Sequence, residues 1–316
     1  MKPRTVFTIA VLLVMMLVSV LITVTMGPTE LSLQAILTDR TASMVFFDIR
    51  LPRVITAFLV GCGLAVAGTA MQGLFKNSMA DPYIIGTSSG AALGAAVSIV
   101  LLGAKGLPIF AFIGATGATF TVYILATRKG RAPVETLLLT GVALSMFFSA
   151  FLSFLMYSAG NSLHQIIFWL MGGFWTVEWS DVRTALLILI GSLVLFVFSR
   201  DLNILSLGEE EAVHLGVNVE RLKKILLLFS SFITGIAVSI AGAIGFIGLI
   251  TPHIMRLIVG PDHRLLLPSA MIAGGLFLLW ADTIARSFAN EMPVGVITSF
   301  VGAPFFVYLL RRRMNA

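Results

Sequence analysis

Long apolar runs constrain the fold of this chain more than any other feature of its sequence. In lipid the backbone must satisfy its own hydrogen bonds, so each run of roughly 17 to 25 apolar residues predicts one membrane-spanning α-helix. We therefore expect an all-α polytopic membrane protein with a single transmembrane domain over residues 1–316. Its ten spans are predicted at Thr5 to Met26, Val54 to Phe75, Ile84 to Gly103, Leu107 to Thr127, Thr136 to Tyr157, Arg183 to Ser199, Ile225 to Ile240, Gly242 to Val259, Pro268 to Phe288 and Val294 to Leu310.

The distribution of basic residues predicts the direction of these spans. With a cytoplasmic N-terminus and ten spans, 15 of the 21 Lys and Arg residues lie on the inner side. Such a bias is typical of cytoplasmic segments, so both termini are expected in the cytoplasm. The outer side keeps six basic residues, which are Arg40, Arg50, Arg53, Lys105, Arg183 and Arg286.

Composition and motifs exclude several classes of function. The net charge of +6 is explained by the inner loops, so nucleic-acid binding is not expected. A single cysteine, Cys62, allows neither an intrachain disulfide nor a cysteine metal cluster. The four histidines, at positions 164, 214, 253 and 263, are scattered, so no metal site is predicted. The chain has no phosphate loop of the form G-x-x-x-x-G-K followed by Ser or Thr, which indicates that it is not itself an ATPase.

The segment LSLGEEEAVHLGVNVERLKK, from Leu205 to Lys224, is unusually charged for a chain in which charged residues make up 11%. Ser206 followed by Glu209 is a capping-box pattern, and acidic residues are favourable at a helix N-terminus. Gly216 is a natural helix stop, and Asn218 can cap a second helix. The pattern predicts two short cytoplasmic helices joined by a glycine, although it is equally compatible with a solvated connector.

Four stretches are similar to the FecCD-type permeases and occur between Arg50 and Arg313 in the family's order. They are RLPRVITAFLVGCGLAVAGTAMQGLFKNSMADPYIIGTSSGA, GEEEAVHLGV, AGAIGFIGLITPHIMRLIVGPDHRLLLP and MPVGVITSFVGAPFFVYLLRR. These permeases are the membrane subunits of type II ATP-binding-cassette importers for iron-siderophore complexes, haem and cobalamin. The resemblance implies a multi-pass protein of the cytoplasmic membrane that transports and performs no enzymatic chemistry.

The resemblance also implies partners. Such a permease pairs with a second copy of itself or with a paralogous permease, and works with two ATPase subunits and an extracytoplasmic substrate-binding protein. The permease binds no cofactor, and ATP and Mg²⁺ are used by the partner ATPase. Two short helices at about residues 207–224 would dock on the ATPase. The coupling residues expected from the resemblance are Ser206, Gly208, Glu209, Glu210, Glu211, His214, Leu215, Gly216, Asn218 and Arg221.

Three arginines on the outer side, Arg50, Arg53 and Arg286, are expected from the resemblance to receive carboxylates of the binding protein. Arginine suits this task because its planar fork binds a carboxylate through two hydrogen bonds. The alternative is that they anchor helix ends to lipid headgroups. Asp282 lies four residues before Arg286 and could pair with it along one helix.

The predicted function is ATP-driven import of a metal chelate, with a ferric siderophore preferred and cobalamin or haem next. An ion-coupled carrier that acts alone is the competing hypothesis. Such carriers need polar or acidic ion sites near the bilayer midplane, and no predicted span has a charge at its middle. In the fifth span, a stripe of Met and Ser is interpreted as a packing face rather than a pathway lining. Its members are Ser145, Met146, Ser149, Ser153 and Met156.

Overall fold

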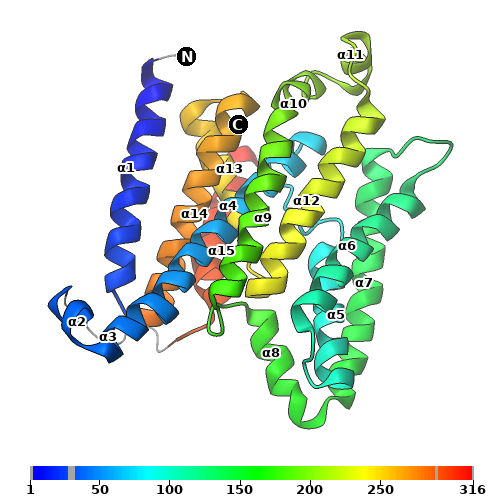
Figure 1. Cartoon of the computed structure of the whole chain (residues 1–316). Helices are drawn as coiled ribbons and strands as arrows, with labels where there is room; N and C mark the ends of the chain where they lie inside the picture. Colours follow the sequence, from blue (N-terminus) through cyan, green and yellow to red (C-terminus); the bar gives the residue numbers. More distant parts are fainter. Residues whose placement is uncertain (1–2, 28–32, 289–290, 315–316) are drawn as a thin grey trace.

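The computed structural model describes residues 3–27, 33–288 and 291–314, and these form an all-α membrane protein (Figure 1). The described residues contain no β-strand, only an isolated backbone bridge between Arg128 and Arg131. The helices are α1 (Pro3–Thr25), α2 (Leu33–Thr38), α3 (Arg40–Met44), the π-helix η1 (Val45–Arg50), α4 (Leu51–Leu74), α5 (Thr87–Leu102), α6 (Leu107–Ala126), α7 (Val134–Ser158), the 3₁₀-helix η2 (Gly160–Ser162), α8 (Leu163–Met171), α9 (Trp179–Val197), α10 (Ser199–Leu205), α11 (Glu209–His214), α12 (Val219–Ala241), α13 (Ile247–Val259), α14 (His263–Phe288) and α15 (Val294–Met314).

Each of the ten predicted spans coincides with one apolar helix. Seven helices in the described residues are long and apolar enough to cross a membrane, and α5, α13 and α15 contribute shorter apolar segments. The start of α1, the end of α15 and helices α10 and α11 lie at one end of the molecule, whereas α2, α3 and α8 lie at the other (Figure 1). The two chain ends and the predicted coupling segment therefore share one end of the bundle, and their location in the cytoplasm stays a prediction. We call the first end cytoplasmic and the second end outer in accordance with that prediction.

Helix α4 is the central element of the bundle, and nearly all of its side chains are buried. It packs against α9, α12, α13 and α14. Two of these contacts depend on glycines. A methyl group at Gly61 would collide with the carbonyl oxygen of Gly274 in α14, and one at Gly68 would collide with that of Gly248 in α13. In lipid the hydrophobic effect does not drive helices together. Close van der Waals contact between small residues stabilises their association instead.

The apolar sequence between α12 and α13 is interrupted close to the boundary expected between the spans Ile225 to Ile240 and Gly242 to Val259. Helix α12 ends at Ala241, and Gly242 takes a positive φ of 67°, which glycine adopts without strain. The irregular backbone that follows is satisfied by protein groups: the Tyr83 hydroxyl donates to the Ile244 carbonyl oxygen at 3.0 Å. Non-helical backbone at membrane depth is tolerated only where it is buried in protein or lines a cavity.

The Met and Ser stripe predicted on the fifth span lies on helix α7. Met146, Ser149 and Ser153 are exposed in this chain rather than packed against it, whereas Met156 is partly buried beside Ile166. The exposed face carries large apolar side chains as well, including Phe154 and Tyr157. This face is therefore available to lipid or to another membrane subunit.

Candidate functional site

All ten predicted coupling residues lie together at the cytoplasmic end of the bundle, around the short helix α11 (Figure 1). Two glycines set the ends of this segment. Gly208 has a φ of 152° and any side chain there would meet the Glu211 carboxylate, and Gly216 has a φ of 82°. Both positions use backbone conformations that favour glycine.

Two details of the predicted coupling segment are wrong. The capping box does not form, because the Ser206 hydroxyl donates to the Asn203 carbonyl oxygen and Gly208 occupies the N-cap of α11 without a side-chain bond. The second short helix is not separate: Asn218 caps it as predicted, at 3.0 Å from the Arg221 amide, but that helix is α12 itself. Hydropathy locates where a span enters lipid, and nothing between Val219 and Ile225 ends the helix there.

One buried lysine holds α11 on the bundle. The side chain of Lys223 is 1% exposed, and its ammonium donates to Glu209 Oε2 at 2.8 Å, to Glu220 Oε1 at 3.2 Å and to the Ala132 carbonyl oxygen at 3.1 Å. These three acceptors match the three N–H donors of an ammonium group. A buried charge without such partners would be strongly destabilising. Lys223 was not among the predicted site residues. Glu209 was predicted as a coupling residue, but its contact with the bundle was not.

The opposite face of α11 is exposed. Glu210, Glu211 and His214 lie on the surface, next to the apolar side chains of Val213 and Leu215, which are 59% and 60% exposed. The buried Ala212 faces the bundle. A short, rigidly attached helix that displays carboxylates beside apolar side chains is suited to binding another protein.

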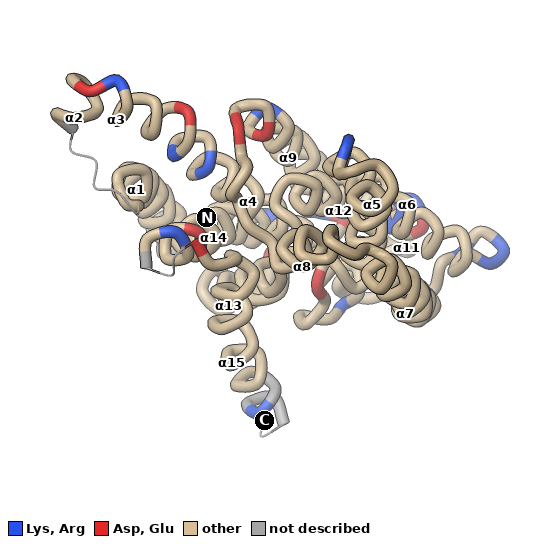
Figure 2. The backbone as a smooth tube through the Cα atoms, turned by 90° about the horizontal axis from the view of Figure 1, so that it is seen from below, with Lys and Arg blue, Asp and Glu red and all other residues tan. Residues whose placement is uncertain are grey.

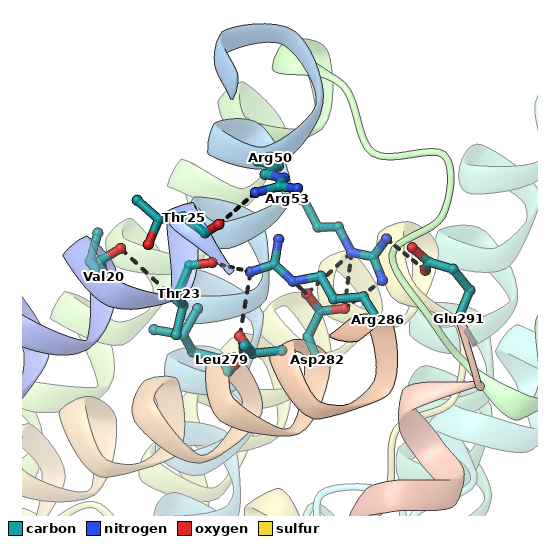
Figure 3. Close-up of polar contacts among 10 residues, drawn as sticks. Val20, Thr23, Thr25, Arg50, Arg53, Leu279, Asp282, Arg286 and Glu291 are labelled. Atoms are coloured by element: carbon teal, nitrogen blue, oxygen red, sulfur yellow. Dashed lines mark hydrogen bonds and ion pairs between the residues drawn. The ribbon is translucent and has the colours of Figure 1, made fainter. Parts of the chain in front are cut away.

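The three outer arginines lie close together, but they point into the protein (Figure 3). Arg53 binds Asp282 through three hydrogen bonds of 2.9 to 3.1 Å, and its third nitrogen reaches Glu291 Oε2 at 2.9 Å. Arg286 donates to the Thr23 carbonyl oxygen, and Arg50 donates to that of Thr25 at 2.7 Å. The three side chains are therefore buried, with residue exposures of 4%, 7% and 3% in chain order.

The main partner of Asp282 differs from the predicted one. The Arg286 Nε atom is 3.7 Å from Asp282 Oδ2, whereas Arg53, 229 residues away in sequence, makes the close contacts. An ionisable residue within an apolar helix must find a partner, and this rule could have signalled Asp282. The sequence could not identify which arginine it would be. The docking role of Arg50, Arg53 and Arg286 stays a prediction.

An apolar hollow of about 610 Å³ lies between the end of α8, the irregular segment after α12, and α15. Its lining includes Met171, Gly245, Ser299 and Phe300, and no charged side chain of the described residues contributes to it. The described residues also hold no group of three or more His, Cys, Asp or Glu side chains arranged to bind a metal ion.

The sequence and fold match known permeases. Residues 9–312 match the FecCD transport family. The chain is 50% identical to the cobalamin import system permease of Halobacterium salinarum over 276 residues, covering 86% of this chain and 75% of that protein. It is 40% identical to the hemin transport system permease of Yersinia pestis, covering 96% and 94%. A solved inward-facing structure of a metal-chelate type ABC transporter superposes with a TM-score of 0.89 at 35% identity, covering 96% of this chain and 98% of that one.

These matches span almost the whole chain and account for its apolar helices and for the lack of a phosphate loop. The relatives are transport subunits, and ATP hydrolysis belongs to a separate subunit. The chain therefore belongs to the FecCD transport family and is the membrane permease subunit of a type II ATP-binding-cassette importer.

Proposed function

We propose that this permease carries cobalamin across the cytoplasmic membrane, working as a dimer with two ATPase subunits and an extracytoplasmic binding protein. The support for the cargo is the 50% identity to a cobalamin permease, together with several vitamin B12 permeases at about 40%. The uncharged lining of the hollow beside α15 suits a bulky chelate that must not bind tightly on its way. Haem is the second candidate because of the hemin permease at 40% identity. The sequence alone favoured a ferric siderophore as the cargo, and the names of these relatives do not support it.

Competition between chelates tests the proposed cargo. In vesicles containing the whole importer, labelled cobalamin is expected to accumulate, and unlabelled haem or ferric siderophore should not displace it. Because the binding protein selects the cargo, the same binding protein must be used for all three compounds. Accumulation of haem or of a ferric siderophore in place of cobalamin would contradict the proposal.

The mechanism follows from the attachment of α11. When the partner ATPase binds ATP and Mg²⁺ and closes, it moves the helix docked on it, and the Lys223 network passes that movement to α12. Helix α12 contacts α4, α6 and α9, so a displacement at the surface reaches the centre of the bundle. The single observation that carries this mechanism is a short acidic helix that is exposed on one face and is held on the other by an ion pair to the buried Lys223.

Reversing the two exposed carboxylates of α11 is expected to uncouple transport. In Glu210→Lys with Glu211→Lys, the surface that meets the ATPase changes sign, whereas Glu209 keeps its bond to Lys223. Loss of charged contacts at an interface costs ~2 kcal/mol or more, so ATP-driven uptake should fall by roughly 30-fold. The measurement is uptake together with co-purification of the ATPase. Arg264→Glu, an exposed charge reversal at the same end, is the control and should retain both; normal uptake by the double variant would contradict the coupling role.

The outer arginines are proposed to receive the binding protein, and the structure adds a condition. Arg53 must exchange a partner for this, and Glu291, whose side chain is 41% exposed, is the one at the surface. Reversal of Arg53 itself would strand the buried Asp282 and is not an informative test. Glu291→Gln keeps the inner pair and removes the competing charge.

Binding-protein affinity is therefore expected to rise in Glu291→Gln. Loss of one exposed competing carboxylate is worth about 0.5–1 kcal/mol, equivalent to a roughly two- to fivefold tighter Kd. Surface plasmon resonance on the detergent-solubilised importer measures this affinity. Asp48→Asn changes another exposed acid of the outer end and should leave Kd unchanged. An unchanged or weaker affinity in Glu291→Gln would argue against docking through Arg53.

A further inference from the structure

A hairpin between α6 and α7 forms a second cytoplasmic feature beside α11. Arg128 and Arg131 exchange backbone hydrogen bonds of 2.9 and 3.1 Å, and Lys129 and Gly130 between them have positive φ values of 51° and 77°. Two consecutive positive φ values are the geometry of a tight two-residue hairpin turn. The hairpin, defined as residues 127–133, carries three exposed basic residues, Arg128, Lys129 and Arg131. The loop between α6 and α7 lies at the edge of the molecule in Figure 1, and Figure 2 shows basic backbone at that edge.

The hairpin is fixed to the same buried lysine as α11. The Ala132 amide donates to Glu220 Oε2 at 3.1 Å, and its carbonyl oxygen accepts from Lys223 at 3.1 Å. Lys223 also binds Glu209 at the start of α11. One ammonium therefore connects three segments, and each of its three acceptors comes from a different one. Separation of the hairpin from α11 would therefore break at least one of the three hydrogen bonds of this buried ammonium.

A groove of about 830 Å³ separates the hairpin from α11. Arg131 lies on one wall, and Glu210 and His214 lie on the other. In the described part of the chain, Arg131 and Glu210 belong to no ion pair. Opposite charges that face one groove without pairing leave both walls available to a partner that carries the complementary charges.

We propose that the hairpin is a second docking element for the ATPase subunit, and that Lys223 is the positioning residue that fixes its spacing from α11. This rests on the proposed function, because the occupant is the same ATPase that binds α11. The groove is continuous with the exposed face of α11, so a subunit seated there reaches Arg131 as well. The element that enters the groove presents a carboxylate to Arg131 and a basic side chain to Glu210.

Arg131→Glu tests the docking element. Association of the purified ATPase with the permease should weaken about tenfold. The control, Arg264→Glu, also reverses an exposed charge at the same end of the bundle and should bind normally. Unchanged association in Arg131→Glu would overturn the docking element and leave the coupling role of α11 intact. If both Arg131→Glu and the Glu210 and Glu211 variant bind normally, the coupling role of α11 fails as well as the docking element.

Lys223→Met tests the positioning residue without any partner protein. Spin labels on cysteines introduced at Lys129 and Val213 report the distance between the hairpin and α11. The native Cys62 is buried, so the spin label should react only with the two introduced cysteines. A single narrow distance distribution is expected for the parent and for Lys224→Met, which removes the exposed neighbouring lysine. Lys223→Met should broaden it about twofold, and adding Glu209→Gln should not restore it. An unchanged distribution in folded Lys223→Met would overturn the positioning role.

Discussion

Replacing Asp282 with alanine is expected to abolish the folded permease. The aspartate side chain is 0% exposed, accepts three hydrogen bonds from Arg53 and lies beside Arg286. Its removal leaves the buried Arg286 without its carboxylate and leaves Arg53 with only the partly exposed Glu291. Breaking a buried pair in this way costs ~3–5 kcal/mol, which is much of the ~5–15 kcal/mol that stabilises a typical protein. Size-exclusion chromatography and thermal unfolding of the detergent-solubilised chain measure the effect.

Two variants make the Asp282 result specific. Asp48→Ala removes an exposed acid from the same end of the bundle and is expected to give the parent yield and melting temperature. Asp282→Asn keeps a hydrogen-bond acceptor for Arg53 and should fall between the parent and the alanine variant. A parent-like melting temperature for Asp282→Ala would show that the ion pair does not stabilise the outer end.

The second large effect is expected at the contact between α4 and α13. Gly68→Ala would place a methyl group against the carbonyl oxygen of Gly248, and backbone cannot yield as a flexible side chain can. Helices α4 and α13 would have to separate, losing the contacts of a fully buried helix. Overpacking of this kind costs roughly 1–3 kcal/mol or more, so we expect a large loss of folded protein and of uptake.

Gly117→Ala is the matched control for Gly68→Ala. Gly117 also lies within a helix, α6, but an added methyl group there would meet no atom within 4 Å. Alanine has the higher helix propensity, so this variant should be as stable as the parent or slightly more stable. If both alanine variants behave alike in thermal unfolding, close packing at Gly68 is not required.

Much of the fold could be predicted because hydropathy and glycine act locally. The positions of the spans follow from the cost of exposing backbone groups to lipid, and the break at Gly242 follows from the conformational freedom of glycine. The start of α12 could not be placed, because its first turns lie in water and carry charges. When one helix continues from water into lipid, the hydropathy of its residues changes but its backbone conformation does not. Hydropathy therefore does not mark where such a helix begins.

The candidate site was predictable only in outline. Charge pattern identified the segment around Glu210, because consecutive carboxylates are rare in such a chain. The inward role of Glu209 depends on Lys223 and on Ala132, which lies 91 residues away from that lysine in sequence. The Arg53–Asp282 pair likewise joins two helices that are far apart in sequence. Tertiary packing decides such pairings, and a single sequence carries no local signal for them.

ATP dependence of uptake tests the central claim most directly. The permease is reconstituted in vesicles with its ATPase and binding protein, and labelled cobalamin uptake is followed with and without ATP and Mg²⁺. We expect accumulation that requires hydrolysable ATP, stops when the ATPase is omitted, and continues when ionophores collapse the ion gradients. Uptake that persists without ATP or the ATPase, and that stops when ionophores are added, would contradict the account and show an ion-driven carrier.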